Sequence, residues 1–224
     1  MRAQNLALRS GNLPLPAFLP DATWGVVRSV DAADLESCGV DALVMNTFHL
    51  AQKPGATTIQ ALGGLHRMTG WKKTIITDSG GFQAYSLIRQ NPKFGQIHPK
   101  GITFYPEASQ RKYLFTPEKV VQLQIGFGSD ILICLDDCTH VDEGYEAQRI
   151  AVDRTIAWAR QSKNEYNKLL DQKKIPVEER PFIFAVVQGG GYKDLRQRCA
   201  DALLEIGFDG FGFGGWPLNK DNQL

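Results

Sequence analysis

Short apolar runs without polar alternation recur along the chain, and amphipathic segments separate them. The runs are centred near residues 16, 43, 76, 133, 185 and 211, and unbroken apolar runs are typical of strands buried on both faces. The intervening segments are expected to form helices over 31–38, 57–62, 116–125, 143–170 and 192–206. This alternation predicts an α/β protein with a parallel sheet and crossover helices.

Two regions depart from this rhythm. Residues 5–19 are expected to form an N-terminal β-hairpin, and residues 84–115 are expected to hold a second hairpin inserted on the rim of the sheet. The second arm of the first hairpin carries Pro14 and Pro16, which have no backbone N–H to donate. We therefore expect that arm to be an edge or entry strand.

Polar side chains and glycines follow the ends of the expected strands. A β-branched run, 74–77, ends on Asp78 and Ser79, and a glycine pair follows that lets the backbone turn sharply. Such a turn alone is weak evidence, because an ordinary strand-ending Asx turn has the same composition. The later strand ends carry Asn46, Asp136, Gln188 and the pair Gly214–Gly215. Repetition at several strand ends favours a functional site.

Polar groups contributed by several strand ends are typical of a (β/α)8 TIM barrel. The alternative, a doubly wound sheet, would carry a glycine-rich phosphate-binding turn after its first strand, and that turn is absent. A barrel needs eight strands and typically about 250 residues. The sequence therefore predicts about six of the eight strands of a TIM barrel, with the N-terminal hairpin and the rim hairpin added.

Composition narrows the classes of function only a little. A formal net charge of +1 over 224 residues gives no global signal for nucleic acid, although a local basic face can coexist with a neutral total. Four scattered cysteines fit a reduced, cytoplasmic protein, and no apolar run reaches the length of a membrane span. Cys134 and Cys138 could face one side of a strand, yet no further ligands follow at zinc spacing. His49 and His66 have no partner pattern and are treated as structural.

The motifs at the strand ends resemble the tRNA-guanine transglycosylases, also called queuine tRNA-ribosyltransferases. They are Asn-Thr-Phe-His-Leu at 46–50, Pro-Gly at 54–55, Thr-Asp-Ser-Gly-Gly-Phe-Gln at 77–83, Asp-Asp-Cys-Thr at 136–139, Val-Gln-Gly at 187–189, Gly-Phe-Asp-Gly at 207–210 and Gly-Gly at 214–215. They occur in the family's order and spacing across nearly the whole chain. The resemblance implies a pentosyltransferase that replaces guanine at the tRNA wobble position with a 7-deazaguanine precursor of queuosine, through a covalent ribosyl-enzyme.

The resemblance also implies roles for the residues that would hold the base. Asp136 matches the family's base-recognition aspartate, which suits the N1–H and amino donors of guanine. Gln188, helped by the backbone N–H of Gly215 beside Gly214, would donate to O6. Phe82 matches the position that stacks on the base, worth about 1–3 kcal/mol.

The same resemblance assigns the proton chemistry and the sugar contacts. Asp78 matches the catalytic aspartate that moves protons on and off the exchanging base, a task suited to a carboxylate. Ser79 and Asn46 match the positions that hold the ribose and the adjoining carboxylate. Asp137 stands where many relatives have Glu, and we expect it to support the site rather than to react.

The sequence departs from the family pattern near its end. The family's nucleophilic aspartate and its zinc site, built from three cysteines and one histidine, come after the last residue, Leu224. We therefore expect residues 1–224 to be a single, C-terminally incomplete barrel domain without the zinc subdomain, to hold no metal and to be inactive alone. Trp216 and Pro217 replace the small residues of many relatives, which leaves open another 7-deazaguanine as incoming base, or a DNA substrate.

Two other functions stay open. The chain could be a non-catalytic subunit that binds base or tRNA, as a homodimer or beside a complementing subunit. It could also be a barrel glycosidase that uses Asp78 and Asp136 as paired carboxylates, for which a separation of about 5 Å would be expected. The Gly-Gly-Phe-Gln context of Asp78, together with Gln188, favours the transglycosylase.

Overall fold

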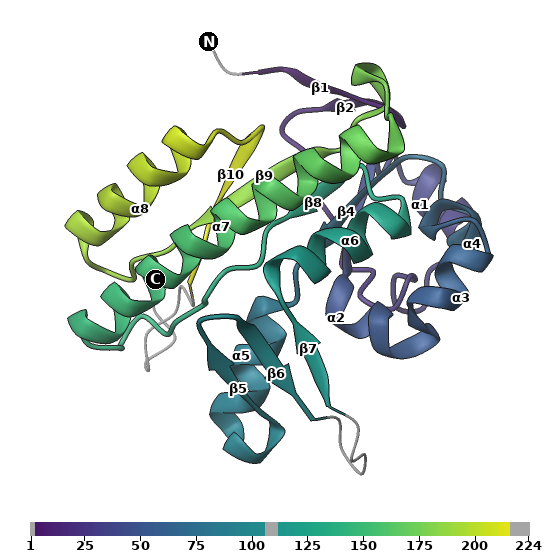
Figure 1. The fold of residues 1–224 in the computed structure, drawn as a ribbon. Coiled ribbons are helices and arrows are strands. Elements are labelled where there is room, and N and C mark those ends of the chain that lie inside the picture. Colours follow the sequence, from purple (N-terminus) through teal and green to yellow (C-terminus); the bar gives the residue numbers. More distant parts are fainter. Residues whose placement is uncertain (1–2, 106–111, 216–224) are drawn as a thin grey trace.

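The computed structural model of the protein describes residues 3–105 and 112–215 (Figure 1). Its centre is a five-stranded parallel sheet in the order β10-β9-β8-β4-β3. The strands are β3 (Ala42–Asn46), β4 (Thr74–Asp78), β8 (Ile131–Ile133), β9 (Phe182–Val187) and β10 (Gly210–Phe213). The predicted α/β class with a parallel sheet is therefore confirmed.

Helices follow the strands in the sequence and cover the sheet. They are α1 (Ala32–Ser37), α2 (Thr47–Leu50), α3 (Ala56–Ala61), α4 (Leu65–Thr69), α5 (Gly81–Gln90), α6 (Pro117–Phe127), α7 (Tyr145–Lys173) and α8 (Lys193–Ile206), with helical turns at Ala51–Gly55, Pro92–Phe94 and Val177–Glu179. Local chemistry sets their ends: Thr116 caps α6 by accepting from the Lys119 N–H at 3.1 Å, and Gly128 ends it in the left-handed region. In the described ranges, no helix has the length and apolar character that crossing a membrane requires.

The long helices α6, α7 and α8 run alongside the strands in Figure 1 and bury the apolar faces that the sequence pattern predicts. Leu132 of β8 and Ile183 of β9 pack with Val121 of α6 and Tyr166 of α7. A neighbouring cluster joins α7 and α8 over Ala185 of β9. Burying a large apolar side chain contributes about 1.5–3 kcal/mol, so these contacts hold the strand ends in fixed positions.

The predicted sheet strand near residue 16 is wrong. The N-terminal segment forms a separate antiparallel pair, β1 (Asn5–Leu8) with β2 (Gly11–Pro14). The backbone that lies beside β3 is instead 20–22, where the Val44 N–H donates to the Pro20 carbonyl at 3.2 Å and the Ala22 N–H donates to the Val44 carbonyl at 2.8 Å. Pro14 and Pro16 lack the N–H groups that a ladder needs, so the pairing starts after them.

The inserted region is larger than one hairpin. Helix α5 leads into a three-stranded antiparallel sheet, β5 (Gly95–His98), β6 (Gly101–Phe104) and β7 (Tyr113–Phe115), which projects from one end of the main sheet in Figure 1. The sequence pattern indicated β6 and β7 but missed β5, whose glycine and polar residues carry little strand propensity. Gly95 fits there because a Cβ would collide with the Thr103 carbonyl.

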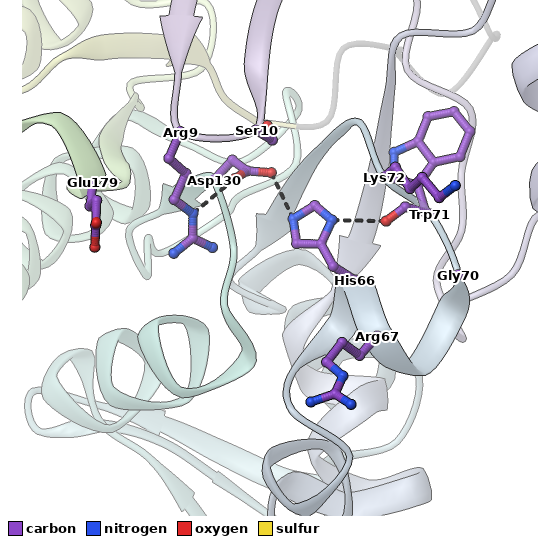
Figure 2. A pocket seen from close by; sticks show the side chains of 9 residues that line it. All are labelled: Arg9, Ser10, His66, Arg67, Gly70, Trp71, Lys72, Asp130 and Glu179. Carbon is purple, nitrogen blue, oxygen red and sulfur yellow. Dashed lines mark hydrogen bonds and ion pairs between the residues drawn. The ribbon is translucent and has the colours of Figure 1, made fainter.

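The N-terminal hairpin is fastened to the amino-terminal end of the main sheet (Figure 2). Asp130, directly before β8, accepts from Arg9 Nε at 2.9 Å, from the Ile75 N–H at 2.8 Å and from His66 Nε2 at 3.0 Å. The other ring nitrogen of His66 lies 2.9 Å from the Trp71 carbonyl. One buried carboxylate thus joins the hairpin, α4, β4 and β8.

Candidate functional site

The predicted site residues gather at the carboxyl end of the parallel sheet. Asn46 and Asp78 end neighbouring strands and are direct partners in the parallel register. Asn46 Nδ2 donates to Asp78 Oδ2 at 2.9 Å, while Asn46 Oδ1 accepts from the His49 N–H at 3.2 Å and caps α2. This second bond fixes the amide orientation, so Asn46 presents a donor to the carboxylate.

Asp78 is the partly exposed acid of the site. Burial raises its pKa above the ordinary value. Hydrogen bonds from the backbone of Gly80 and Ser79 and from the side chains of Asn46 and Ser79 oppose that rise. Burial and hydrogen bonding thus act in opposite directions on this carboxyl group, and burial has the larger effect.

Both residues after Ser79 must be glycine because neighbouring atoms approach their backbone closely. Gly80 has φ +87°, and a Cβ there would collide with the Cβ of Phe48. A Cβ on Gly81 would stand 2.8 Å from the Asp136 carbonyl and 3.3 Å from its Oδ1. Gly81 therefore allows the turn after β4 to lie directly against Asp136.

Asp136 and Gln188 form the buried centre of the site. Gln188 Nε2 donates to Asp136 Oδ2 at 2.6 Å, and the two residues are 0% and 8% exposed, respectively. Burial, with smaller contributions from the charges of Asp78 and Asp137, raises the pKa of Asp136 to about 7, against the lowering effect of Gln188. Within the described residues, the Oε1 atom of Gln188 is buried without a hydrogen-bond partner. The centre thus retains unused hydrogen-bonding capacity, which is typical of a binding site.

The glycines after β10 pack against this centre. A side chain at Gly214 would collide with Val186 and would come within 2.5 Å of Gln188 Nε2, so only glycine fits. The backbone N–H of Gly215 favours the ionised form of the Cys138 thiol. Burial, together with the nearby carboxylates, raises the pKa of that thiol to about 12.

The remaining predicted residues lie on the turn and helix after β4. Ser79 is buried, and its hydroxyl accepts from the Gly81 N–H at 3.2 Å. Phe82 lies in the first turn of α5 and is partly exposed. Their placement beside Asp78 is compatible with the predicted contacts to sugar and base, which stay predictions.

Sequence reasoning missed two arginines on helices α7 and α8 that contact the loops and the carboxylates of the site. Arg196 of α8 donates to the carbonyls of Val187, Gly190 and Gly214 at 2.6, 2.9 and 2.9 Å, and so joins the loops after β9 and β10. Arg154 of α7 pairs with Asp137. Burial raises the pKa of Asp137, and the charge of Arg154 opposes the rise. An arginine in the helix after a glycine-rich strand end was the available signal for Arg196.

A pocket of about 740 Å³ lies at the opposite end of the strands (Figure 2). Its lining includes Arg9, His66, Lys72, Asp130 and Glu179, and none of the predicted site residues. Asp130 accepts hydrogen bonds from three partners there, which indicates a structural role. This pocket and the predicted site residues therefore lie at opposite ends of the sheet.

The described residues do not fit a metal ion. Within 3–105 and 112–215 there is no cluster of three or more His, Cys, Asp or Glu side chains placed to hold one. Burial raises the pKa of the Cys134 thiol to about 12, which disfavours the thiolate that zinc requires. The predicted absence of a metal in this chain stays a prediction.

Comparison with known proteins agrees with this arrangement. A family model described as queuine tRNA-ribosyltransferase matches residues 1–224. The queuine tRNA-ribosyltransferase of Thermotoga neapolitana is 39% identical over 219 residues, which cover 98% of this chain and 55% of the relative. That of Solibacter usitatus is 37% identical over 224 residues, which cover 100% of this chain and 57% of the relative.

The chain thus spans 55–57% of the length of these two relatives. The match over 224 residues confirms the resemblance drawn from the strand-end motifs. This chain belongs to the queuine tRNA-ribosyltransferase family.

Proposed function

We propose that this chain recognises guanine within tRNA and contributes to its exchange for a 7-deazaguanine base, a precursor of queuosine. The observation that carries the proposal is the buried Asp136–Gln188 pair at 2.6 Å beside Asp78. A carboxylate and an amide at the bottom of a sheet-end site match the donors and the acceptor on one edge of guanine. Family membership supports the same substrate class.

Base recognition follows from the hydrogen-bonding capacity of each side chain. Ionised Asp136 accepts from guanine N1–H and from the exocyclic amino group. Gln188 Nε2 carries two N–H groups, so it can donate one to O6 while the other stays on Asp136. Phe82 covers a face of the base, and the base leaves the RNA stack to reach the site.

Asp78 moves the protons. When the bond between ribose C1′ and the leaving base breaks, the freed ring nitrogen takes a proton from the carboxyl group of Asp78. The incoming base loses a proton from its corresponding nitrogen to the same carboxylate before it bonds to C1′. Asn46, which donates to Asp78 at 2.9 Å, orients the carboxylate through both half-reactions.

A group outside the described residues is expected to attack C1′. Among the described residues, the aspartates at this end of the sheet are already engaged: Asp78 with Asn46, Asp136 with Gln188 and Asp137 with Arg154. We therefore propose that 1–224 is one incomplete domain of a (β/α)8 barrel, which binds base without exchanging it. Catalysis would need further strands and a nucleophile from elsewhere.

Guanine titration tests the recognition site. Asp136→Asn should lower guanine affinity about 10- to 100-fold, because a neutral amide replaces a charged acceptor whose hydrogen bond contributes about 1.5–3 kcal/mol. Asp142→Asn is the matched control, since that side chain is about half exposed and lies 3.6 Å from His140 Nδ1. Affinity should also rise between about pH 6 and 8 as Asp136 ionises. Equal guanine affinity in the parent and in Asp136→Asn would sink the proposal.

Labelled-guanine incorporation into tRNA separates an enzyme from a binding subunit. We expect no incorporation by the 224-residue chain alone, together with measurable guanine binding. Incorporation would show that the nucleophile lies within the 224 residues and would overturn the proposal that 1–224 binds base without exchanging it. Binding of RNA without any guanine binding would favour the non-catalytic subunit.

A further inference from the structure

Basic charge is concentrated in the inserted region and the first turn of α6. Residues 84–119 contain six Lys or Arg and two Asp or Glu, a net charge of +4, whereas the whole chain has +1. The rest of the protein is therefore slightly acidic. A local basic face on a near-neutral protein is the electrostatic footprint of a polyanion site.

Four lysines of this region are exposed in the structure: Lys93, Lys100, Lys112 and Lys119. None of them forms an ion pair with another described residue. Lys93 and Lys112 flank the end of the small sheet where Gly95 pairs with Phe104, and Lys100 lies in the turn at its other end. The charges are thus spread over the length of the insertion and are free to meet an external anion.

The insertion lies next to the candidate site. Helix α5 begins in the glycine turn after Asp78 and leads directly into the small sheet. Phe48, whose Cβ lies against Gly80, packs its ring on Phe104 and Phe115 at centroid distances of 4.6 and 5.5 Å. An RNA that delivers a base to Asp136 therefore has neighbouring nucleotides within reach of the insertion.

A groove of about 410 Å³ continues this surface. One wall comes from the segment after α2, with Gln52, Gly55 and Thr58, and the other from the insertion and α6, with Tyr113 and Lys119. Phe115 lines the groove and also touches Phe48. Its volume falls within the range of small-molecule sites, and its walls offer polar groups and a lysine.

We propose that the exposed lysines of the insertion, with the adjoining groove, bind the sugar–phosphate backbone of the RNA whose guanine enters the site. The inference rests on the proposed function and adds to it a second, separate contact surface. Phosphate contacts position the RNA without reading its sequence, so they leave base selection to Asp136 and Gln188. Each phosphate neutralised on a single strand releases counterions and adds about 0.7 to the slope of log affinity against log salt.

The test uses a fluorescent RNA stem–loop with one guanine in its loop. The variant K93E/K100E/K112E should bind it at least about 10-fold more weakly at about 50 mM salt and with a salt slope lower by about 2. The control K72E/K173E/K174E changes the net charge equally with exposed lysines at the other end of the sheet. It should bind like the parent, and K93Q/K100Q/K112Q should show a smaller loss than the glutamate variant.

Several results would overturn the inference: equal losses in the two glutamate triples, an unchanged insertion triple, or a parent that binds no RNA. Guanine titration distinguishes failure of this inference from failure of the proposed function. The insertion triple should keep the parental guanine affinity, and Asp136→Asn should lose guanine while keeping the lysine-dependent docking of an RNA without a loop guanine. Matching circular dichroism and thermal midpoints establish that each triple is folded.

Discussion

The two ends of the parallel sheet each bury an aspartate, and the two aspartates behave in opposite ways. At the amino-terminal end, burial of Asp130 would raise its pKa, but hydrogen bonds from His66, Ile75 and Arg9 outweigh it and lower the pKa. At the carboxyl end, Asp136 has a neutral amide as partner and two other carboxylates nearby, and its pKa rises to about 7. Both are almost fully buried, so the partners cause the difference.

The contrast separates stability from function. Asp130 accepts from donors on three other elements, the hairpin, α4 and β4, so it joins these parts of the fold; Figure 2 shows its contacts with Arg9 and His66. Asp136 lies where folding leaves a charge poorly compensated, an arrangement that is typical of functional sites. The same residue type thus serves as a structural clasp at one end, Asp130 with Arg9 and His66, and we propose that it serves as a receptor for the base at the other.

Removing the structural carboxylate should have the largest effect. Asp130→Asn replaces an acceptor with an amide that faces cationic donors, and we expect the free energy of unfolding to fall by about 3 kcal/mol. This is the low end of the range for a broken buried pair, since the side chains of Arg9 and His66 keep 30% and 27% exposure. Urea unfolding measures it.

Asp41→Asn is the matched control, because its ion pair with Lys73 at 2.8 Å is more than one-third exposed on both sides. It should cost less than about 1 kcal/mol. Equal losses for the two variants would contradict the structural role of the Asp130 cluster.

A glycine at the carboxyl end should be nearly as sensitive. Gly80→Ala places a side chain at φ +87° and drives its Cβ into Phe48, so we expect a loss of about 2–3 kcal/mol. Gly70→Ala shares the left-handed backbone, at φ +74°, but its Cβ would meet nothing within 4 Å, so it should cost about 1 kcal/mol. The difference between the two unfolding free energies isolates the collision. Identical losses would mean that Phe48 moves aside without cost.

Neutralising the receptor carboxylate should stabilise the fold. Because the folded pKa of Asp136 lies above its ordinary value, its contribution to stability is present at low pH and is lost as pH rises toward 7 and beyond. Asp136→Asn carries no charge at any pH, so it should exceed the parent by about 1–2 kcal/mol at pH 8 and approach it at about pH 4, near the unfolded pKa of the parent carboxyl. Unfolding curves at the two pH values measure the gap. A variant less stable than the parent at pH 8 would contradict the poorly compensated charge.

The sequence predicted the receptor end better than the clasp end. The receptor residues can be recognised in the sequence because each follows an apolar strand, and parallel strands bring their carboxyl ends together. They are Asn46, Asp78, Asp136 and Gln188. The clasp has no such signature: Arg9 and Asp130 are 121 positions apart, and His66 lies in a five-residue helix. Contacts of that kind depend on how the hairpin docks, which local pattern does not encode. Sequence reasoning missed Arg196, which holds the loops around Gly214, for the same reason.

The smallest expected effect concerns the protonation of His66 in the clasp. His66 is faced by Asp130 and Arg9; burial and the charge of Arg9 lower its pKa, but Asp130 outweighs them and raises it. A raised histidine pKa contributes stability that is present below about pH 6.5 and is lost as pH rises through the folded value. His66→Gln removes the titration but keeps a donor, so the parent should lead it by about 1 kcal/mol at pH 6 and by less at pH 8.5. A pH-independent gap would mean that neutral His66 already makes the whole contribution, so that the clasp works through its hydrogen bonds and not through charge.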